Sequence, residues 1–197
     1  PLFCDMSSDI LSRPVPAEQF DLIYAGIQKN LGPAGAAVVI IKKSLLDHAR
    51  RDIPPILQYR TFADHNSLYN TPPVFCIYMM NKMLRWIDRQ GGTAAMEEQA
   101  VKKSSLIYRI IDESRGFYKG HAEKGSRSRM NITFNLADPA MEQDFIRQAA
   151  LRGLAGIRGH RLVGGCRVSL YNAVSEEACR TLARFMKEYQ NHHKGGI

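Results

Sequence analysis

The chain has 197 residues, and its 45% hydrophobic content is enough to bury a core, which excludes a mainly disordered protein. Its 27 basic and 19 acidic residues give a net charge of +8, which suits a phosphorylated or acidic ligand and would also suit nucleic acid. The four cysteines are widely scattered and no run approaches the roughly 20 apolar residues that span a bilayer. We therefore expect free thiols, no metal site and a soluble cytoplasmic protein without a membrane partner.

Three short apolar runs occupy the first part of the chain, at residues 1–4, 20–25 and 36–41. Each has the length of a strand and is continuously apolar, which is typical of a sheet covered on both faces, as in α/β folds. A Gly-Pro-Ala-Gly sequence at residues 32–35 predicts a tight turn between the last two runs. An apolar run at Pro1 would leave a strand without a partner, so we expect an amino-terminal half to precede it in a longer polypeptide.

Helical spacing of apolar residues begins after the proline pair at residues 72–73 and ends at the glycine pair at residues 91–92. A second amphipathic helix is predicted from about residue 94 to 114, with Lys103 among the charged residues away from its apolar side. Strand and helix patterns then alternate, at residues 129–136, 141–154, 167–171 and 175–192. This order predicts a small α+β domain in the second half of the chain.

Lys29 closely follows the second apolar run and precedes the turn at residues 32–35. Ligands in open α/β sheets collect beyond the carboxyl ends of the strands. A lysine at such an edge can act as a neutral amine and attack an aldehyde. The same spacing also fits an ordinary exposed loop lysine.

Asp5 ends the first apolar run. A pyridoxal cofactor needs a carboxylate at its pyridine nitrogen, and two adjacent strands could supply Asp5 and Lys29 to opposite ends of one ring. Asn70 and Thr71 stand just before a predicted helix start, which suits the phosphate of such a cofactor. A turn or cap for Asp5, and plain helix capping for Asn70 and Thr71, are the alternatives.

A glycine-rich segment carries His160, Arg161 and Arg167. The planar guanidinium of arginine matches carboxylates and phosphates in a bidentate way. An amino acid that bears a phosphate presents both groups, so one arginine for each is a reasonable division. Solvated surface residues without a ligand are the alternative.

Five motifs in order resemble those of the phosphoserine aminotransferase family, within the class-V, aspartate-aminotransferase-like pyridoxal-phosphate enzymes. They lie at residues 5–8, 26–35 around Lys29, 68–73, 128–131 and 159–173. The resemblance runs essentially from end to end. It implies an α/β fold, in which residues 1–94 form the carboxyl-terminal part of the large PLP-dependent transferase (fold type I) domain. Residues 95–197 would form the small α+β carboxyl-terminal domain.

The resemblance also implies the roles of the cofactor residues. Lys29 would carry pyridoxal 5'-phosphate as a Schiff base and move the proton between the substrate α-carbon and the cofactor. Asp5 would pair with the pyridine nitrogen, and Gln28 would help to hold the cofactor. Asn70 and Thr71 would reach the cofactor phosphate of the neighbouring subunit in a homodimer.

For the substrates, the resemblance implies that His160 and Arg161 assist with the distal phosphate or carboxylate and that Arg167 binds the α-carboxylate. The implied reaction is reversible amino transfer between glutamate and 3-phosphohydroxypyruvate. It gives 2-oxoglutarate and O-phosphoserine and belongs to serine biosynthesis.

The chain departs from the family pattern by an absence, because family members are nearly twice as long. Their amino-terminal half supplies a phosphate-binding turn and an aromatic ring stacked on the cofactor. Two alternatives therefore stay open: a non-catalytic fragment that assembles with a separate amino-terminal half, and a related PLP aminotransferase or desulfurase, which would keep Lys29 and Asp5. A nucleic-acid partner is disfavoured, because the basic residues are dispersed and aromatic residues make up only 9% of the chain.

Overall fold

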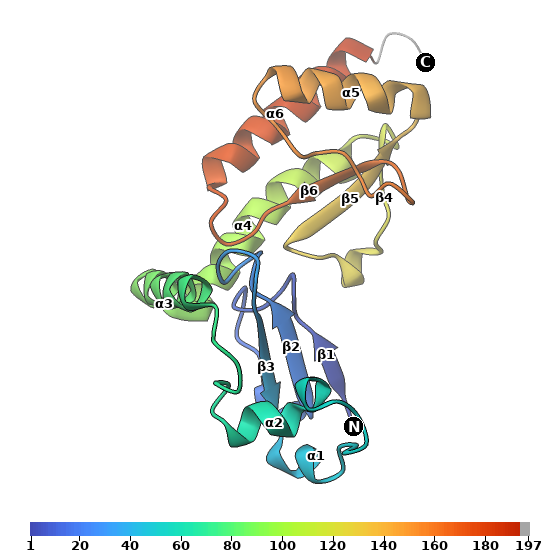
Figure 1. Ribbon diagram of the computed structural model, residues 1–197. Coiled ribbons are helices and arrows are strands. Elements are labelled where there is room, and N and C mark those ends of the chain that lie inside the picture. Colours follow the sequence, from blue (N-terminus) through green and yellow to red (C-terminus); the bar gives the residue numbers. More distant parts are fainter. Residues whose placement is uncertain (194–197) are drawn as a thin grey trace. The chain divides into compact units, whose positions relative to one another are not determined.

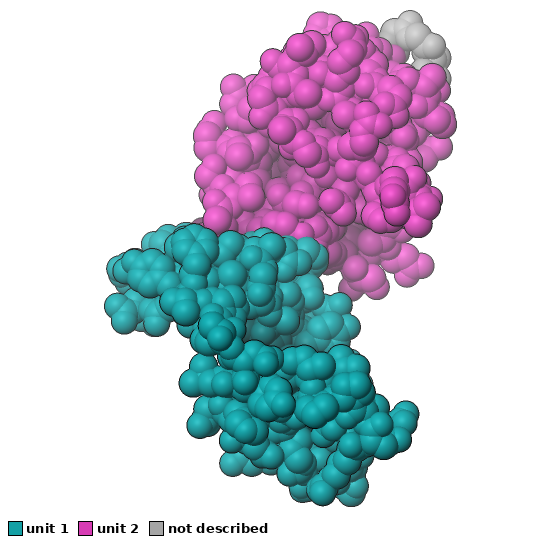
Figure 2. Space-filling model, in the orientation of Figure 1, with its two compact units in different colours: residues 1–93 teal, residues 94–197 magenta. Residues whose placement is uncertain are grey.

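The computed structural model describes residues 1–193 of the chain. The chain divides into two compact units, residues 1–93 and residues 94–197, which Figure 2 colours separately. Each unit has its own three-stranded sheet and its own hydrophobic core. No helix of the described part is long and apolar enough to cross a membrane.

The first unit is built on a sheet whose strands lie in the order β1, β2, β3 (Figure 1). All three predicted strands form: β1 spans Phe3–Asp5, β2 spans Leu22–Gly26 and β3 spans Ala37–Ile41. β1 and β2 are parallel, whereas β3 runs antiparallel to β2. Because parallel neighbours end at the same edge of a sheet, Asp5 and the residues that follow Gly26 lie at one edge.

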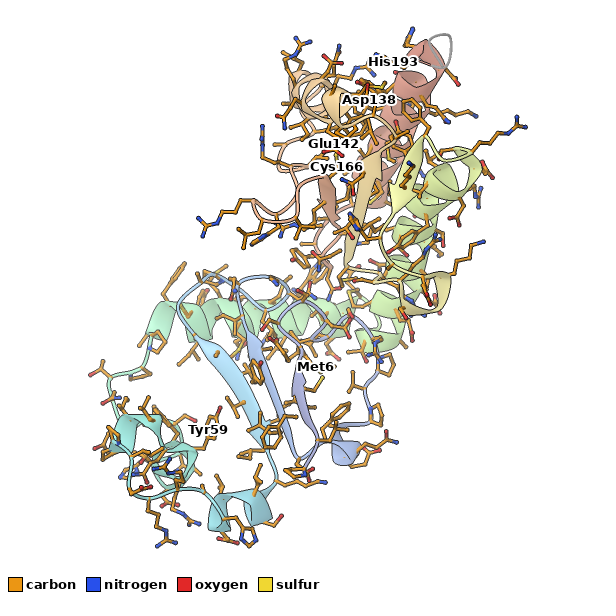
Figure 3. All side chains as sticks on the ribbon, turned by 90° about the vertical axis from the view of Figure 1, so that its right-hand side faces the viewer. Met6, Tyr59, Asp138, Glu142, Cys166 and His193 are labelled. Carbon is orange, nitrogen blue, oxygen red and sulfur yellow. The ribbon has the colours of Figure 1, made fainter. Side chains whose placement is uncertain are left out.

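The predicted turn between β2 and β3 is confirmed, and it packs against helix α3 (Val74–Arg89). Gly35 has a φ of +128°, and a Cβ at this position would lie 3.0 Å from Sγ of Cys76 on α3. Only glycine combines this backbone conformation with such a close approach. The buried core of the unit, in which Figure 3 labels Met6, consists of Met6, Ile10, Ile23, Ala25, Ile27, Leu31 and Cys76.

One face of this sheet is open in the described chain. The strand register places Phe3, Tyr24 and Val39 on the same face, and they are 56%, 40% and 37% exposed. Leu22 on the same face is 5% exposed, so the predicted cover of both faces is met only in part within residues 1–193. The buried core lies on the side of Ile23 and Ala25, so it leaves the opposite side to solvent.

Between β3 and α3 the chain forms two short helices that the sequence analysis missed, α1 (Lys43–Asp47) and α2 (Tyr59–Asp64). Three single 3₁₀ turns, at Ala17–Gln19, Pro55–Leu57 and Lys124–Ser126, were also missed. Helices of five or six residues carry too few turns to show an apolar period. The predicted helix after the proline pair is confirmed as α3.

The second unit contains α4 (Gly92–Glu113), β4 (Tyr118–Gly120), β5 (Asn131–Leu136), α5 (Pro139–Leu151), β6 (Cys166–Ser169) and α6 (Glu176–His193). Its strands form an antiparallel sheet in the order β4, β5, β6. Ile132, Phe134 and Leu136 are buried while their neighbours on β5 are half-buried, so the helices cover one face of the sheet (Figure 1). The predicted alternation of strand and helix is confirmed, whereas β4 was missed.

Lys103 on α4 corrects one prediction. It was placed with the charged residues of a surface helix, but it is 3% exposed. Its Nζ donates to the carbonyl oxygens of Leu170, Tyr171 and Val174 at 3.1, 2.9 and 2.9 Å. Burial lowers the pKa of Lys103, since the fold removes water from its charge. Three main-chain acceptors replace that water, so the residue ties α4 to the segment that follows β6.

Candidate active site

Asp5 and Lys29 meet at the carboxyl edge of the first sheet. Asp5 is the last residue of β1, and Lys29 lies three residues beyond the end of β2. Lys29 is half-buried, and its Nζ donates a hydrogen bond to Oγ of Ser8 at 2.6 Å. The parallel pairing of β1 and β2 thus brings together two candidate residues that are 24 positions apart in the sequence.

The surroundings of Asp5 favour its ionised form. Ser7 hydrogen-bonds to the carboxylate, including a backbone N–H···Oδ1 bond of 2.8 Å, and Tyr24 donates a further hydrogen bond. These bonds, together with the positive charge of Lys29, lower the pKa of Asp5. The bond from Ser7 is the turn contact that the sequence left open as an alternative. It engages one of the two carboxylate oxygens, so it does not exclude a ligand at Asp5.

Tyr24 pairs with Asp5 in the strand register and shares its open face. Its hydrogen bond to the Asp5 carboxylate raises the pKa of Tyr24, and Tyr59 of α2, labelled in Figure 3, adds to this effect. Tyr24 is a neighbour of the candidate site that sequence reasoning did not single out. The signal was present, because parallel pairing of the first two apolar runs sets their last residues side by side.

The turn after β1 is fixed against the end of β2 by two hydrogen bonds. The backbone N–H of Met6 donates to the carbonyl oxygen of Tyr24 at 2.8 Å, and the N–H of Gly26 donates to Oγ of Ser7 at 3.2 Å. Ser8 follows directly in this turn. Its hydroxyl is therefore held at a defined place next to the segment that carries Lys29.

Gln28 is exposed, and its side chain folds back over Gly26, where a Cβ would lie 2.6 Å from Oε1 of Gln28.

The residue after Lys29 is Asn30, which is fully buried and donates from Nδ2 to the carbonyl oxygen of Ile10 at 3.0 Å. Asn30 anchors the lysine segment to the core, a role that the sequence analysis missed. A single buried amide carries no periodic signal by which a pattern could identify it.

Asn70 and Thr71 are exposed. Helix α3 begins at Val74, its N-cap position is Pro73, and no side chain caps it. Capping by Asn70 or Thr71, the alternative reading, is therefore not observed. No hydrogen bond within residues 1–193 joins either residue to Lys29, so their part in a cofactor site stays a prediction.

His160 and Arg161 lie in a loop of the second unit that closes on itself. The N–H of Gly159 donates to the carbonyl oxygen of Gly165 at 2.9 Å, and the N–H of Gly164 donates to that of His160 at 2.8 Å. The loop needs glycine at its neck, since a Cβ at position 159 would lie 2.0 Å from the carbonyl oxygen of Gly164. Both His160 and Arg161 are exposed, and the N–H of Leu162 donates to Nδ1 of His160 at 3.3 Å.

The three predicted substrate residues, His160, Arg161 and Arg167, line two different pockets of the second unit. His160 and Arg161 line a pocket of about 300 Å³ that also takes in Glu142 of α5. Figure 3 shows Glu142 beside Cys166. Burial of the Cys166 thiol raises its pKa to about 12, and the negative charge of Glu142 adds to this effect. Arg167 on β6 lines a separate pocket of about 270 Å³ next to α6. The structure thus separates Arg167 from the pair formed by His160 and Arg161.

Comparison with known proteins shows the family of this chain. Residues 1–182 match the family model of the class-V aminotransferases. A phosphoserine aminotransferase of Lysinibacillus sphaericus is 55% identical over 194 residues, which are 98% of this chain and 54% of that protein. The chain therefore spans about half the length of the curated relatives it matches.

Two solved structures of phosphoserine aminotransferases superpose closely. One, described by radiation damage of its Schiff base, has a TM-score of 0.95 at 53% identity and covers 98% of this chain and 53% of the other. The second, bound to PLP and from Trichomonas vaginalis, has a TM-score of 0.89 at 38% identity over 95% of this chain and 53% of the other. The sequence match, the fold and the edge with Asp5 and Lys29 agree, and the chain belongs to the class-V aminotransferase family.

Proposed function

We propose that residues 1–197 form part of a phosphoserine aminotransferase that binds pyridoxal 5'-phosphate through Lys29. The observation that carries the proposal is the placement of Lys29 and Asp5 at one edge of two parallel strands. Hydrogen bonds from Ser7 and Tyr24 lower the pKa of Asp5, and the charge of Lys29 adds to this effect. The PLP-bound relative from Trichomonas vaginalis supports the choice of cofactor.

The residues at this edge fit that cofactor. When bound, pyridoxal phosphate supplies an electron sink for the α-carbon of an amino acid. Asp5 stays ionised at neutral pH, because its hydrogen bonds favour the carboxylate, and it would hold a proton on the pyridine nitrogen. The Lys29 amine would take the α-proton of the substrate and pass it on to the cofactor side of the adduct, while the exposed Gln28 would help to hold the ring.

We assign the substrate contacts to the second unit. Arg167 would bind the α-carboxylate, and His160 and Arg161 would bind the distal phosphate or carboxylate. Their placement in two separate pockets supports such a division between two anionic groups. The reaction would exchange the amino group between glutamate and 3-phosphohydroxypyruvate, giving 2-oxoglutarate and O-phosphoserine.

The same proposal covers assembly and location. The two units would be the carboxyl-terminal part of the large domain and the small domain of the enzyme. Asn70 and Thr71, which are exposed, would reach the cofactor phosphate of a second subunit in a homodimer. The four cysteines are free thiols, which suits the reducing cytoplasm.

The test uses a completed enzyme, defined as residues 1–197 joined to the part of the Lysinibacillus sphaericus relative that they do not cover. Pyridoxal phosphate is added, the protein is reduced with borohydride, and peptide mapping locates the modified lysine. We expect the label on Lys29 and its loss in Lys29→Ala. The matched control is Lys42→Ala, because Lys42 is an exposed lysine paired with Asp21 at 3.0 Å. A label that persists in Lys29→Ala would refute the proposal.

The substrate assignment has its own test in the completed enzyme. A lost charge-assisted pair costs about 1.5–3 kcal/mol. Arg167→Ala should therefore raise the KM for glutamate about 10- to 100-fold with a smaller change in kcat. An unchanged KM would remove Arg167 from the substrate site. The 197-residue chain assayed by itself separates a self-sufficient enzyme from one that needs the remaining length.

A further inference from the structure

Lys29 has a neutral partner in this structure. Its Nζ donates to the Ser8 hydroxyl at 2.6 Å, and none of the ion pairs within residues 1–193 includes it. Lys42 of the same unit shows the contrast, because it pairs with the carboxylate of Asp21. The charge of Lys29 contributes to the lowered pKa of Asp5, after the hydrogen bonds from Ser7 and Tyr24, whereas the direct contact of the Lys29 amine is made by a hydroxyl.

The chemistry of a hydroxyl differs from that of a carboxylate at this place. A carboxylate only accepts hydrogen bonds and favours an ammonium beside it. A serine hydroxyl accepts from an N–H of the amine and can also donate to its lone pair, so it can hold the nitrogen in both protonation states. A lysine that must gain and lose a proton within one reaction cycle needs such a partner.

The turn that carries the Ser8 hydroxyl is fixed by the fold of the first unit. The turn that carries it is bonded to β2 through Met6 and through Oγ of Ser7. On the other side, buried Asn30 anchors the segment of Lys29 to the core. Both partners of the 2.6 Å bond therefore sit on fixed backbone.

We propose that Ser8 is a positioning residue that holds the Lys29 amine for proton transfer, a role that rests on the proposed function. In the step concerned, the Lys29 amine would take the proton from the α-carbon of the amino-acid substrate, and the bound cofactor would supply the sink for the C–H electron pair. The Lys29 ammonium would then deliver that proton to the cofactor side of the substrate–cofactor adduct and return to the neutral amine. Ser8 keeps the nitrogen in place through both transfers.

The contact itself can be tested on the 197-residue chain without cofactor. Nitrogen-15 NMR at low temperature measures how fast the ammonium protons of each lysine exchange with water. We expect exchange at Lys29 to be several-fold faster in Ser8→Ala than in the unchanged chain, with Lys42 constant as internal reference. Ser8→Thr keeps the hydroxyl and should retain slow exchange. Equal rates at Lys29 in all three proteins would overturn the proposal.

The catalytic consequence is measured in the completed enzyme. A misplaced reacting group costs up to about 100-fold in rate. Ser8→Ala should lower kcat about 10- to 100-fold, leave the KM for glutamate within about two-fold, and increase the slowing caused by α-deuterated glutamate. Ser8→Thr should restore most of kcat, and Ser44→Ala, at an exposed serine of α1, should match the unchanged enzyme.

The two proposals fail in different ways. An unchanged kcat and isotope effect in Ser8→Ala, with the cofactor still on Lys29, would reject the role of Ser8 alone. Absence of the cofactor label from Lys29 in the enzyme with Ser8 intact would reject the proposed function. The exchange measurement on the chain decides the Ser8 contact in either case.

Discussion

Replacing Lys103 by methionine tests whether a buried ammonium holds the second unit together. The side chain is 3% exposed and its nitrogen bonds to three carbonyl oxygens, those of Leu170, Tyr171 and Val174. Methionine keeps a similar length and fills the same space, so the change removes the three bonds with little change in packed volume.

The magnitude follows from two opposing contributions. A buried carbonyl that loses its donor costs about 1–3 kcal/mol. The carbonyl of Tyr171 keeps the N–H of Val174 at 2.9 Å, so the loss falls mainly on the other two and amounts to roughly 2–6 kcal/mol. The variant also avoids taking an ammonium out of water, which is worth several kcal/mol in the opposite direction. We expect the free energy of unfolding of the second unit to fall by about 1–3 kcal/mol.

Urea denaturation followed by circular dichroism measures this loss, and hydrogen exchange of the amides that follow β6 locates it. Lys102→Met is the matched control, because Lys102 is the exposed neighbour on the same helix. It should change stability by less than about 0.5 kcal/mol. A gain in stability for Lys103→Met, or a loss no larger than that of the control, would show that the carbonyls need no cation.

Two substitutions and one chemical modification test other parts of the second unit. Gly159→Ala should open the loop neck, where a Cβ would meet the carbonyl oxygen of Gly164 at 2.0 Å, and speed up tryptic cleavage in the loop. Asp112→Asn should cost about 1 kcal/mol at pH 7. Because the hydrogen bond from Arg127 lowers the pKa of Asp112, this difference should be full above pH 3.8, shrink as the pH falls below 3.8, and vanish below the lowered pKa in urea titrations. Cys166, whose pKa burial raises to about 12, should resist iodoacetamide at pH 8 until the protein unfolds.

Each of these expectations has a contrary result. Unchanged cleavage in the alanine variant would mean that the loop neck tolerates a side chain. A stability difference for Asp112→Asn that is as large at pH 2 as at pH 7 would exclude the ion pair with Arg127 as its source. Rapid modification of native Cys166 would contradict its burial.

The sequence predicted most of the secondary structure, because its long elements carry a clear apolar period. α3 and α6 begin within two residues of the predicted start, and the first three apolar runs all form strands. The edge with Asp5 and Lys29 was also predictable, since ligand-bearing residues follow the ends of parallel strands. Whether these residues bind a cofactor stays a prediction.

The remaining features depend on contacts that no local pattern encodes. Lys103 was predicted to lie on the exposed side of its helix because it is charged, although Ala100 and Ile107 on the same helix face are both buried. Its position in the helical repeat, three residues after one and four before the other, was the signal for burial. The partners of Lys103 lie about 70 residues away, and Ser8 meets Lys29 across 21 residues, so only the folded chain shows those bonds.

The closed loop of the second unit has a consequence for how this enzyme family can change. Main-chain bonds and the glycines at positions 159, 164 and 165 set its shape, and Nδ1 of His160 accepts a hydrogen bond from the N–H of Leu162, whereas no hydrogen bond within residues 1–193 joins the Arg161 side chain to the loop. Side chains at its tip can therefore be exchanged without refolding the loop. Under the proposed function, substitutions at these positions would alter which negatively charged substrates are accepted while the loop keeps its shape.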